Sequence, residues 1–251
     1  MRLLLLAAGY ATRLYPLTRD RPKHLLEVAG RPILEHLLDR LAPIGFDAVY
    51  LVTNARFAGR FQEWAAGYGD VRVIDDGTTD DATKLGAIGD LDLVIREEGI
   101  DDDLVVAAGD SLFSDSLEGF GATARERRAP LLAVYDVREP ELVKRYSEVR
   151  VDGSGRIVHL QEKPAEPRST LSGVALYHYP RETLPLVARY LSEGGNPDQP
   201  GRLVEWLYRR ENVYAWQVPG AWLDIGSPET LAEADRLFSE AAGATARAAG
   251  R

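Results

Sequence analysis

The residues best suited to phosphate chemistry lie near the start of the chain, in the segment "LAAGYATRLYPLTRDRPK". An apolar run over residues 3–7 leads directly into Gly9, and Arg13 and Lys23 follow. A glycine turn lets backbone amides face a bound anion, while arginine offers a planar fork to phosphate oxygens and lysine a compact charge. A triphosphate best accounts for this combination. A simple turn followed by solvated loop charges is an equally good interpretation of these residues alone.

Two well-known phosphate fingerprints are absent from this segment. The chain lacks the pattern GxxxxGK[ST], and GxGxxG fails because Ala11 and Leu14 stand where further glycines are required. These absences disfavour a P-loop kinase and a dinucleotide-dependent dehydrogenase.

Two aspartates far apart in the sequence are candidates for holding a metal ion. Asp110 follows Gly109 at the end of an apolar run, and Asp224 lies in "WLDIG", also at an expected strand end. Two carboxylates, together with phosphate oxygens and water, are a common way to bind Mg²⁺. Taken singly, each aspartate is better explained by a turn or a helix cap.

The overall composition limits the class of partner. Thirty basic and thirty-nine acidic residues give a net charge of −9, which disfavours a nucleic-acid or anionic-membrane surface. The chain has no cysteine, so disulfides, thiolate metal sites and cysteine nucleophiles are excluded. No run approaches the ~18 apolar residues of a membrane helix. We expect a soluble, cytoplasmic protein without nucleic-acid or membrane partners, and leave a homo-oligomer open.

The elements that must position these residues follow an α/β pattern in the first half. Near-continuous apolar runs, expected as strands covered on both faces, occupy residues 3–7, 48–53, 71–74, 104–108 and 131–137. Segments with helical periodicity lie between them at residues 31–45, 57–66 and 85–98. This alternation predicts a doubly wound, mixed but mostly parallel sheet.

After about residue 140 the pattern becomes richer in strands. Residues 148–164 read as two strands joined by "DGSG", and residues 170–179 as another strand. Helices are expected at residues 181–192, 202–210 and 227–241, with a polar loop at residues 193–201. We interpret this half as an insertion onto the same sheet and predict one domain over residues 1–240. The nucleotide-binding half would cover 1–137 and the sugar-phosphate half 138–226, and residues 241–251 would form a flexible tail.

Four separated motifs resemble those of one enzyme family. "LAAGYATRLYPLT…RPKHLLEVAGRPIL", "AAGDSLF", the segment containing "EKP" and "WLDIGSPETLAEA" occur in the order found in the sugar-1-phosphate nucleotidyltransferases. These are the relatives of glucose-1-phosphate thymidylyltransferase. The resemblance extends over nearly the whole chain and implies a Rossmann-like fold. It also implies attack of a sugar-1-phosphate on a nucleoside triphosphate, which yields an NDP-sugar and pyrophosphate.

The resemblance assigns expected roles to individual residues. Arg13, Lys23 and Lys163 would be catalytic, and Asp110 and Asp224 would hold Mg²⁺. The nucleotide would contact Leu6, Ala8, Gly9, Ala11, Thr12, Arg13, Lys23, Leu85, Gly86 and Gly109. The sugar phosphate would contact Tyr146, Glu162, Lys163 and Gly173. A glutamate suits sugar hydroxyls because an ionised carboxylate accepts several hydrogen bonds.

Several positions depart from the family pattern. Ala11 replaces the second loop glycine, where a methyl group penalises positive φ. Ser147 and Ala175 also stand where glycine is common, and "TTDDATKLG" lacks the usual glutamine and proline of the base-binding segment. These changes leave the base and sugar open, with dTTP or UTP and glucose-1-phosphate as the first expectation. The alternatives are a cytidylyltransferase acting on a non-sugar phosphate, such as inositol or choline phosphate, and a non-catalytic relative that binds nucleotide sugars.

Overall fold

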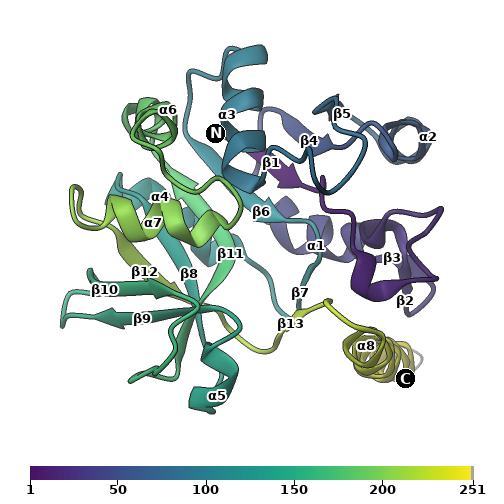
Figure 1. The fold of residues 1–251 in the computed structure, drawn as a ribbon. Coiled ribbons are helices and arrows are strands. Elements are labelled where there is room, and N and C mark those ends of the chain that lie inside the picture. The colour runs from purple at the N-terminus through teal and green to yellow at the C-terminus, as the bar shows by residue number, and fades with distance from the viewer. Residues whose placement is uncertain (250–251) are drawn as a thin grey trace.

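A nine-stranded mixed sheet forms the centre of the protein (Figure 1). We describe it from a computed structural model, which covers residues 1–249. The strand order is β10-β9-β11-β6-β1-β4-β5; β8 joins this order by pairing with β11, and β12 pairs with β8. The strands of residues 1–137 and of residues 138–226 therefore share one sheet, as expected for an insertion.

The first half supplies the parallel part of the sheet. Its strands are β1 (Arg2–Leu6), β4 (Val49–Thr53), β5 (Val71–Asp75) and β6 (Leu104–Ala108). β1 lies between β4 and β6 and is parallel to both, so the segments that follow these strands emerge at the same edge. This is the edge at which ligands bind in open α/β sheets.

The second half adds mainly antiparallel strands. They are β9 (Ser147–Val151), β10 (Ile157–Glu162), β11 (Leu171–Tyr179) and β12 (Tyr214–Gln217). β11 and β12 flank β8 (Leu131–Asp136), the last strand of the first half. β11 pairs antiparallel with β6, β8 and β9, and so it joins the two halves. The hairpin expected around "DGSG" is β9–β10.

Helices cover both faces of the sheet, as the doubly wound prediction requires. Leu3 and Leu5 of β1 pack in one apolar core with α1 (Ile33–Leu41), α2 (Ala58–Tyr68) and α4 (Glu118–Arg127). Leu4 and Leu6 pack in a second core with α3 (Ala87–Glu97), α6 (Pro185–Ser192) and α7 (Pro200–Leu207). Successive β-strand side chains point to opposite faces, so the run of leucines fills both cores. A short helix, α5 (Pro140–Val143), precedes β9.

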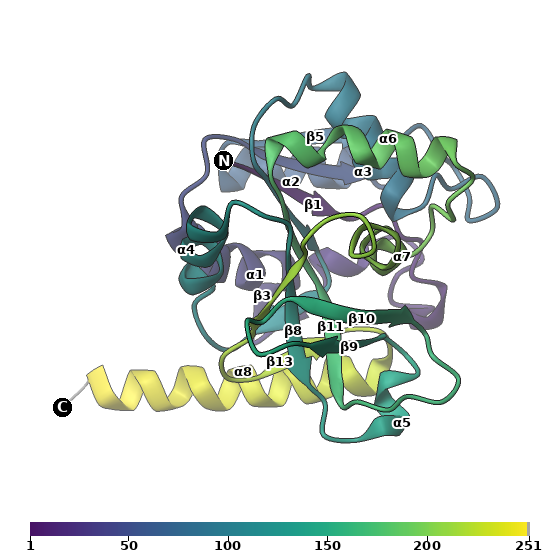
Figure 2. The same cartoon turned by 90° about the vertical axis from the view of Figure 1, so that its left-hand side faces the viewer.

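Two small sheets lie beside the main one. β2 (Glu27–Val28) pairs with β3 (Arg31–Pro32), and β7 (Ser111–Phe113) pairs antiparallel with β13 (Trp222–Asp224). The chain then enters α8 (Pro228–Ala249), which lies along one side of the molecule, away from α3 and α6 (Figure 2). Ser227 caps this helix by accepting a hydrogen bond from the Thr230 amide at 3.3 Å.

Helix α8 continues beyond residue 240, where the sequence led us to expect a flexible tail. It reaches Ala249, and residues 250 and 251 lie outside the described part of the chain. The segment "AGATARAA" is rich in alanine, the strongest helix former, which explains the continuation. None of the helices in residues 1–249 combines the length and apolarity needed to cross a membrane.

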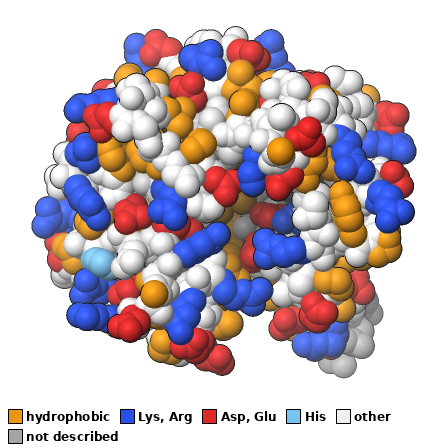
Figure 3. Space-filling model, viewed as in Figure 1, with side chains coloured by type: hydrophobic (Ala, Val, Ile, Leu, Met, Phe, Trp, Pro, Cys, Tyr) orange, Lys and Arg blue, Asp and Glu red, His pale blue; other side chains and the backbone are white. Residues whose placement is uncertain are grey.

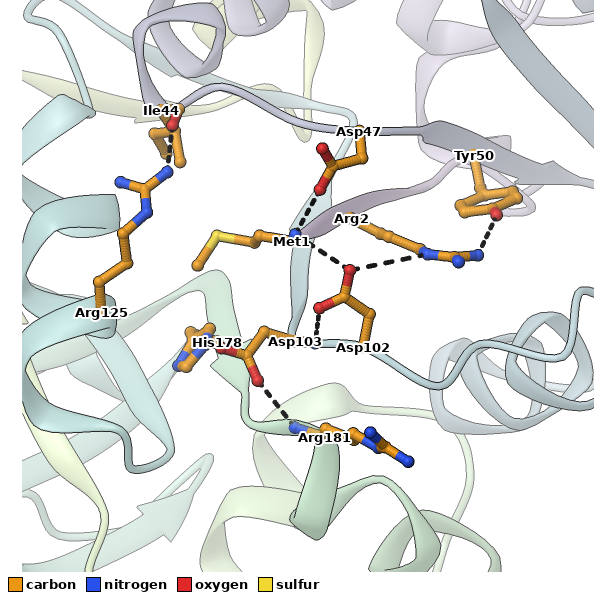
Figure 4. Close-up of polar contacts among 10 residues, drawn as sticks. All are labelled: Met1, Arg2, Ile44, Asp47, Tyr50, Asp102, Asp103, Arg125, His178 and Arg181. Carbon is orange, nitrogen blue, oxygen red and sulfur yellow. Dashed lines mark hydrogen bonds and ion pairs between the residues drawn. The ribbon is translucent and has the colours of Figure 1, made fainter.

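Polar contacts fix the end of the sheet opposite the candidate site (Figure 4). The Met1 ammonium donates to Asp47 Oδ2 at 2.6 Å and to Asp102 Oδ2 at 3.1 Å. Arg2 donates to the Tyr50 hydroxyl at 2.8 Å. These contacts tie the start of β1 to the segments before β4 and β6, which helps to set the register of the central strands.

Candidate active site

The loop after β1 contains a residue in the left-handed backbone conformation. Ala11 adopts a left-handed conformation, with φ 48° and ψ 40°, directly before a short 3₁₀ turn over Thr12–Leu14. Its carbonyl accepts hydrogen bonds from Thr18 Oγ1 at 2.8 Å and from the Leu14 amide at 3.0 Å. The loop therefore holds an L-residue in a region that favours glycine, as the sequence led us to suspect.

The two candidate metal ligands lie close together. β7 begins directly after Asp110, and β13 ends at Asp224, which pairs in register with Ser111. The Ile225 amide donates to the Asp110 carbonyl at 3.2 Å. A two-strand pairing thus joins residues more than one hundred positions apart at the end of the parallel strands.

The charges around this pair are strongly coupled. Burial, and then the charge of Asp110, raises the pKa of Asp224 to about 6. Burial also opposes ionisation of Asp110, but Lys23, whose ammonium donates to Asp110 Oδ2, outweighs it and keeps that pKa below its usual value. Burial lowers the pKa of His24 to about 4, so this ring is neutral at pH 7 and adds no positive charge.

The carboxylate oxygens of Asp110 and Asp224 suit a hard divalent cation that binds together with substrate. No cluster of three or more His, Cys, Asp or Glu side chains able to hold a metal occurs in the part of the chain that the structure describes. Mg²⁺ does not require such a cage, because it usually takes one or two carboxylates and completes its octahedron with phosphate oxygens and water. Asp110 and Asp224 could supply two such carboxylates, and the charge of Asp110 raises the pKa of Asp224, an effect that a bound cation would relieve.

A cavity of about 400 Å³ joins the loop, the aspartates and the start of α3. It is lined by Leu6, Ala8, Gly9, Ala11, Arg13, Lys23, His24, Asp81, Lys84, Gly86, Ala87, Asp90, Ala108, Asp110, Ala175, Asp198, Gln199, Pro200 and Asp224. The space-filling view is hollowed near its middle, where acidic and basic side chains gather around the depression (Figure 3). A larger hollow of about 920 Å³ lies at the other end of β4 and β5. None of the predicted site residues lines that second hollow.

Nine of the predicted site residues line this cavity. They are Leu6, Ala8, Gly9, Ala11, Arg13, Lys23, Gly86, Asp110 and Asp224. Three predicted nucleotide residues do not belong to its walls, namely Thr12, Leu85 and Gly109. Gly109 has another reason to lack a side chain, because a Cβ there would lie 2.8 Å from His24 Cδ2.

The predicted sugar-phosphate residues lie beside the cavity rather than in its wall. Burial, and then the charge of Asp224, raises the pKa of the Tyr146 phenol, which therefore lies near the aspartate pair. The Tyr146 carbonyl accepts a hydrogen bond from the Lys163 amide at 2.7 Å, and Lys163 has φ 48°. This geometry brings the backbone of "EKP" next to the tyrosine, while the Lys163 side chain is exposed.

Gly173 and Glu162 share a tightly packed corner with Ser147. A Cβ at Gly173 would lie 2.5 Å from Ser147 Oγ, so the serine already fills the space next to this glycine. A Cβ at Gly201 would overlap Glu162 Oε2, so α7 packs directly on the carboxylate. Burial raises the pKa of Glu162, and the neighbouring cations Lys163 and Arg202 oppose that shift.

The loop at residues 193–199 closes the cavity at the start of α3. The Ile88 amide donates to the Pro197 carbonyl at 2.8 Å, and Lys84 pairs with Asp198 at 3.0 Å. A Cβ at Gly86 would lie only 2.6 Å from the Pro197 oxygen, so the close approach requires glycine at this point. The sequence predicted only a polar loop here.

Several ionisable residues around the cavity were not identified from the sequence. The positive charges of Lys23, Arg13 and Arg145 counteract the rise in the pKa of Asp224. The Arg145 guanidinium therefore lies within electrostatic reach of the Asp110 and Asp224 carboxyl groups. Asp90 and Asp198 line the cavity from α3 and from the loop before α7. The position of Arg145, directly before the predicted Tyr146, was the one local signal that could have identified it.

Comparison with known proteins agrees with this geometry. A family model described as nucleotidyl transferase matches residues 2–240. The chain is 27% identical to the bifunctional protein GlmU of Methanocaldococcus jannaschii over 239 residues, covering 95% of this chain and 54% of that protein. It is 29% identical to the UTP–glucose-1-phosphate uridylyltransferase AglF of Haloferax volcanii, covering 96% and 97%. It thus spans about half the length of the first relative and nearly all of the second.

A solved structure shares the fold. The structure of a UDP-glucose pyrophosphorylase complexed with UDP-glucose superposes with a TM-score of 0.79 at 20% identity, covering 95% of this chain and 98% of that one. The predicted α/β nucleotidyltransferase fold is therefore confirmed. With a family model matching almost the entire length, the chain belongs to the nucleotidyl transferase family.

Proposed function

We propose that the protein transfers a nucleotidyl group from a nucleoside triphosphate to a sugar-1-phosphate, releasing pyrophosphate and forming an NDP-sugar. The observation that carries this proposal is the convergence of Arg13, Lys23, Asp110 and Asp224 on one cavity. Two cations and two carboxylates at the end of a parallel sheet match the needs of a triphosphate bound with a divalent metal ion.

Positioning and charge neutralisation do most of the catalytic work in such a transfer. A phosphate oxygen of the sugar-1-phosphate attacks the α-phosphorus in line with the leaving pyrophosphate, and the protein holds both groups in that geometry. Arg13 stabilises the charge that develops on the leaving phosphates, since its guanidinium can bind two oxygens at once. Lys23 forms an ion pair with Asp110. From this position its ammonium would contact the α- and β-phosphates.

Asp110 and Asp224 would hold Mg²⁺, which would neutralise phosphate charge and orient the reacting groups when bound. The two aspartates would keep the ion at the edge of the cavity next to Lys23. Tyr146, which lies near Asp224, would border the ion on the side of the sugar phosphate.

The second half would receive the sugar-1-phosphate. Lys163 would pair with its phosphate, and Glu162 would accept hydrogen bonds from sugar hydroxyls. Tyr146 and Gly173 would shape the sugar pocket. This orientation is supported by the contact between Lys163 and Tyr146, whose phenol lies near Asp224.

UTP or dTTP with glucose-1-phosphate is the first substrate pair to test. AglF of Haloferax volcanii is named a UTP–glucose-1-phosphate uridylyltransferase, and a relative from Streptomyces antibioticus, 27% identical, is named a glucose-1-phosphate thymidylyltransferase. These names favour a sugar acceptor over inositol or choline phosphate, and an active enzyme over a non-catalytic relative. We also propose that the enzyme works in the cytoplasm, in keeping with its lack of cysteine.

Pyrophosphate release over a matrix of nucleoside triphosphates and sugar-1-phosphates tests the proposal. We expect magnesium-dependent release with at least one pair and, from the same reaction, an NDP-sugar identified by mass. A folded protein that is inactive on every pair would contradict the proposal. Activity confined to CTP with a polyol phosphate would favour the alternative enzyme.

A further inference from the structure

Two carboxyl groups of the nucleotide-binding half have no role in the transfer described above. Asp76 follows β5, and Asp90 lies in the first turns of α3. Asp90 is only 4% exposed, and yet it lines the cavity. Asp90 Oδ1 and Asp76 Oδ2 are both buried without a hydrogen-bond partner. Such oxygens are costly to leave unpaired, so this pair requires an explanation.

One shared proton satisfies both oxygens. The two carboxyl groups lie close enough for a hydrogen bond to form once one of them carries a proton. Burial, and then the neighbouring Asp76, raises the pKa of Asp90 to about 8. Asp76 keeps more of its charge, because its Oδ1 accepts a hydrogen bond from the Thr78 amide at 2.7 Å. The proton therefore belongs to Asp90, which is neutral at pH 7 and donates to Asp76.

Asp90 lies at the end of the cavity where the nucleobase of the proposed substrate would lie. Arg13 and Lys23, the proposed phosphate-binding cations, line the cavity beside Asp110 and Asp224. Asp90 lies at the end of the cavity that is formed by α3. Lys84, the cation at that end, already pairs with Asp81 at 3.3 Å and with Asp198 at 3.0 Å. A triphosphate held with a metal ion at Asp110 and Asp224 would leave its base at the α3 end.

The helix geometry aims Asp90 in the required direction. Helical side chains point back toward the N-terminus of their helix. The Asp90 amide donates to the Gly86 carbonyl at 2.8 Å, so the carboxyl group lies over the turn that opens α3. That turn and Asp90 line the same end of the cavity.

We propose that Asp90 determines nucleobase specificity: Oδ1 donates its proton to Asp76, and Oδ2 accepts a hydrogen bond from the ring N–H of the base. This inference rests on the proposed function and adds to it. Uracil, thymine and guanine carry a ring N–H on their pairing edge. Cytosine and adenine carry a lone pair at the same position and would face the acceptor oxygen with a repulsive contact.

The size of the effect follows from the cost of an unpaired group. A site built to hydrogen-bond a substrate N–H rejects an analogue that lacks it, because a buried acceptor is then left without a donor. We therefore expect UTP to bind at least ~10²-fold more tightly than CTP or N3-methyl-UTP, in which a methyl group replaces the proton in question.

Calorimetric titration of these three nucleotides, without sugar phosphate, tests the proposal in four proteins. They are the wild type, Asp90→Asn, Asp90→Ala and Asp92→Ala. Asparagine can donate to Asp76 and still present a carbonyl oxygen, so Asp90→Asn should keep the preference for UTP. Asp90→Ala should reduce it to within ~10-fold. Asp92 lies on the same helix and pairs with Arg96 at 2.8 Å, outside the cavity, and its variant should behave like the wild type.

Three results would overturn the proposal in distinguishable ways. A folded Asp90→Ala protein that binds UTP and keeps the wild-type preference over CTP would show that Asp90 does not read the base. A wild type that prefers CTP would contradict the base assignment and leave nucleotidyl transfer standing. A wild type that binds no nucleotide would contradict the proposed function itself.

Discussion

Asp110 and Asp224 are held together by the pairing of β7 with β13, in which Asp224 stands opposite Ser111 and the Ile225 amide donates to the Asp110 carbonyl at 3.2 Å. Neither carboxylate lies on a flexible loop tip, because each is attached to a strand end by this small sheet. A metal ion bound by both would therefore have a fixed position relative to the phosphate loop.

Removing either carboxylate charge should abolish most of the activity without unfolding the protein. Asp110→Asn and Asp224→Asn are each expected to lower kcat by at least ~10²-fold, because metal-assisted charge stabilisation is lost. Circular dichroism and thermal melting serve as the fold control.

Since the pKa of Asp224 is raised to about 6, its charge is unfavourable in the metal-free fold. Metal-free Asp224→Asn should therefore melt at a higher temperature than the wild type at pH 7, and near-normal turnover in both variants would refute the metal assignment.

The kcat/KM of the reaction should depend on pH through the protonation of Asp224. Its raised pKa of about 6 means that the carboxylate gains a proton as the pH falls through that value. A protonated carboxyl group is a poor metal ligand, so kcat/KM should fall roughly tenfold per pH unit below about 6 at limiting metal concentration. Saturating Mg²⁺ should shift this limb to lower pH, because metal and proton compete. An acidic decline in kcat/KM that does not change with metal concentration would contradict the assignment of Asp224 as a metal ligand.

The strained loop residue offers a test with a matched control. Ala11 has φ 48° in the phosphate loop, and Ala29 has φ 49° in the turn between β2 and β3, away from the cavity. Replacing either by glycine relieves left-handed strain and should raise the free energy of unfolding by about 0.5–1 kcal/mol. Only Ala11→Gly should also lower KM for the triphosphate, because the lost methyl lets the backbone approach phosphate. Equal effects of both variants on KM would argue that the Ala11 loop does not bind the nucleotide.

The contact between Gly86 and the loop at residues 193–199 should be essential for nucleotide binding. Gly86→Ala introduces both left-handed strain at φ +80° and a Cβ 2.6 Å from the Pro197 oxygen. Gly45→Ala introduces similar strain at φ +77° with no atom within 4 Å. Both should lose about 1 kcal/mol of stability from strain alone. Gly86→Ala should additionally raise KM for the nucleotide at least tenfold, measured by steady-state kinetics, whereas an unchanged KM would show that the loop position does not matter.

Much of the sheet could be predicted from the sequence because its central strands are buried on both faces. Leu3 and Leu5 pack in one apolar core and Leu4 and Leu6 in the other, so the strand is an unbroken apolar run. Such a run is typical of a strand that is buried on both faces. The β9–β10 hairpin was equally accessible, since its turn residues and alternation are local signals. These strands and this hairpin could be predicted because their evidence lay within a few consecutive residues, whereas the convergence of Arg13, Lys23, Asp110 and Asp224 was expected only from the family resemblance.

The features that escaped prediction depend on contacts between distant segments. Nothing in "DDGTTDDATKLGAIGD" indicates that Asp76 and Asp90 touch, or that Pro197 will lie against Gly86. Gly109 was interpreted as a nucleotide contact, yet its closest constraint is the ring of His24. Side-chain proximity of this kind arises from tertiary packing, so local periodicity cannot reveal it.

The central claim, that one metal–triphosphate complex binds between the two halves, is tested most directly by a crystal structure with Mn²⁺ and the preferred triphosphate. We expect an anomalous Mn²⁺ peak bridging the carboxylates of Asp110 and Asp224, with the triphosphate oxygens at Arg13 and Lys23. A metal bound elsewhere, or a triphosphate lying outside the cavity formed by these four residues, would contradict the account.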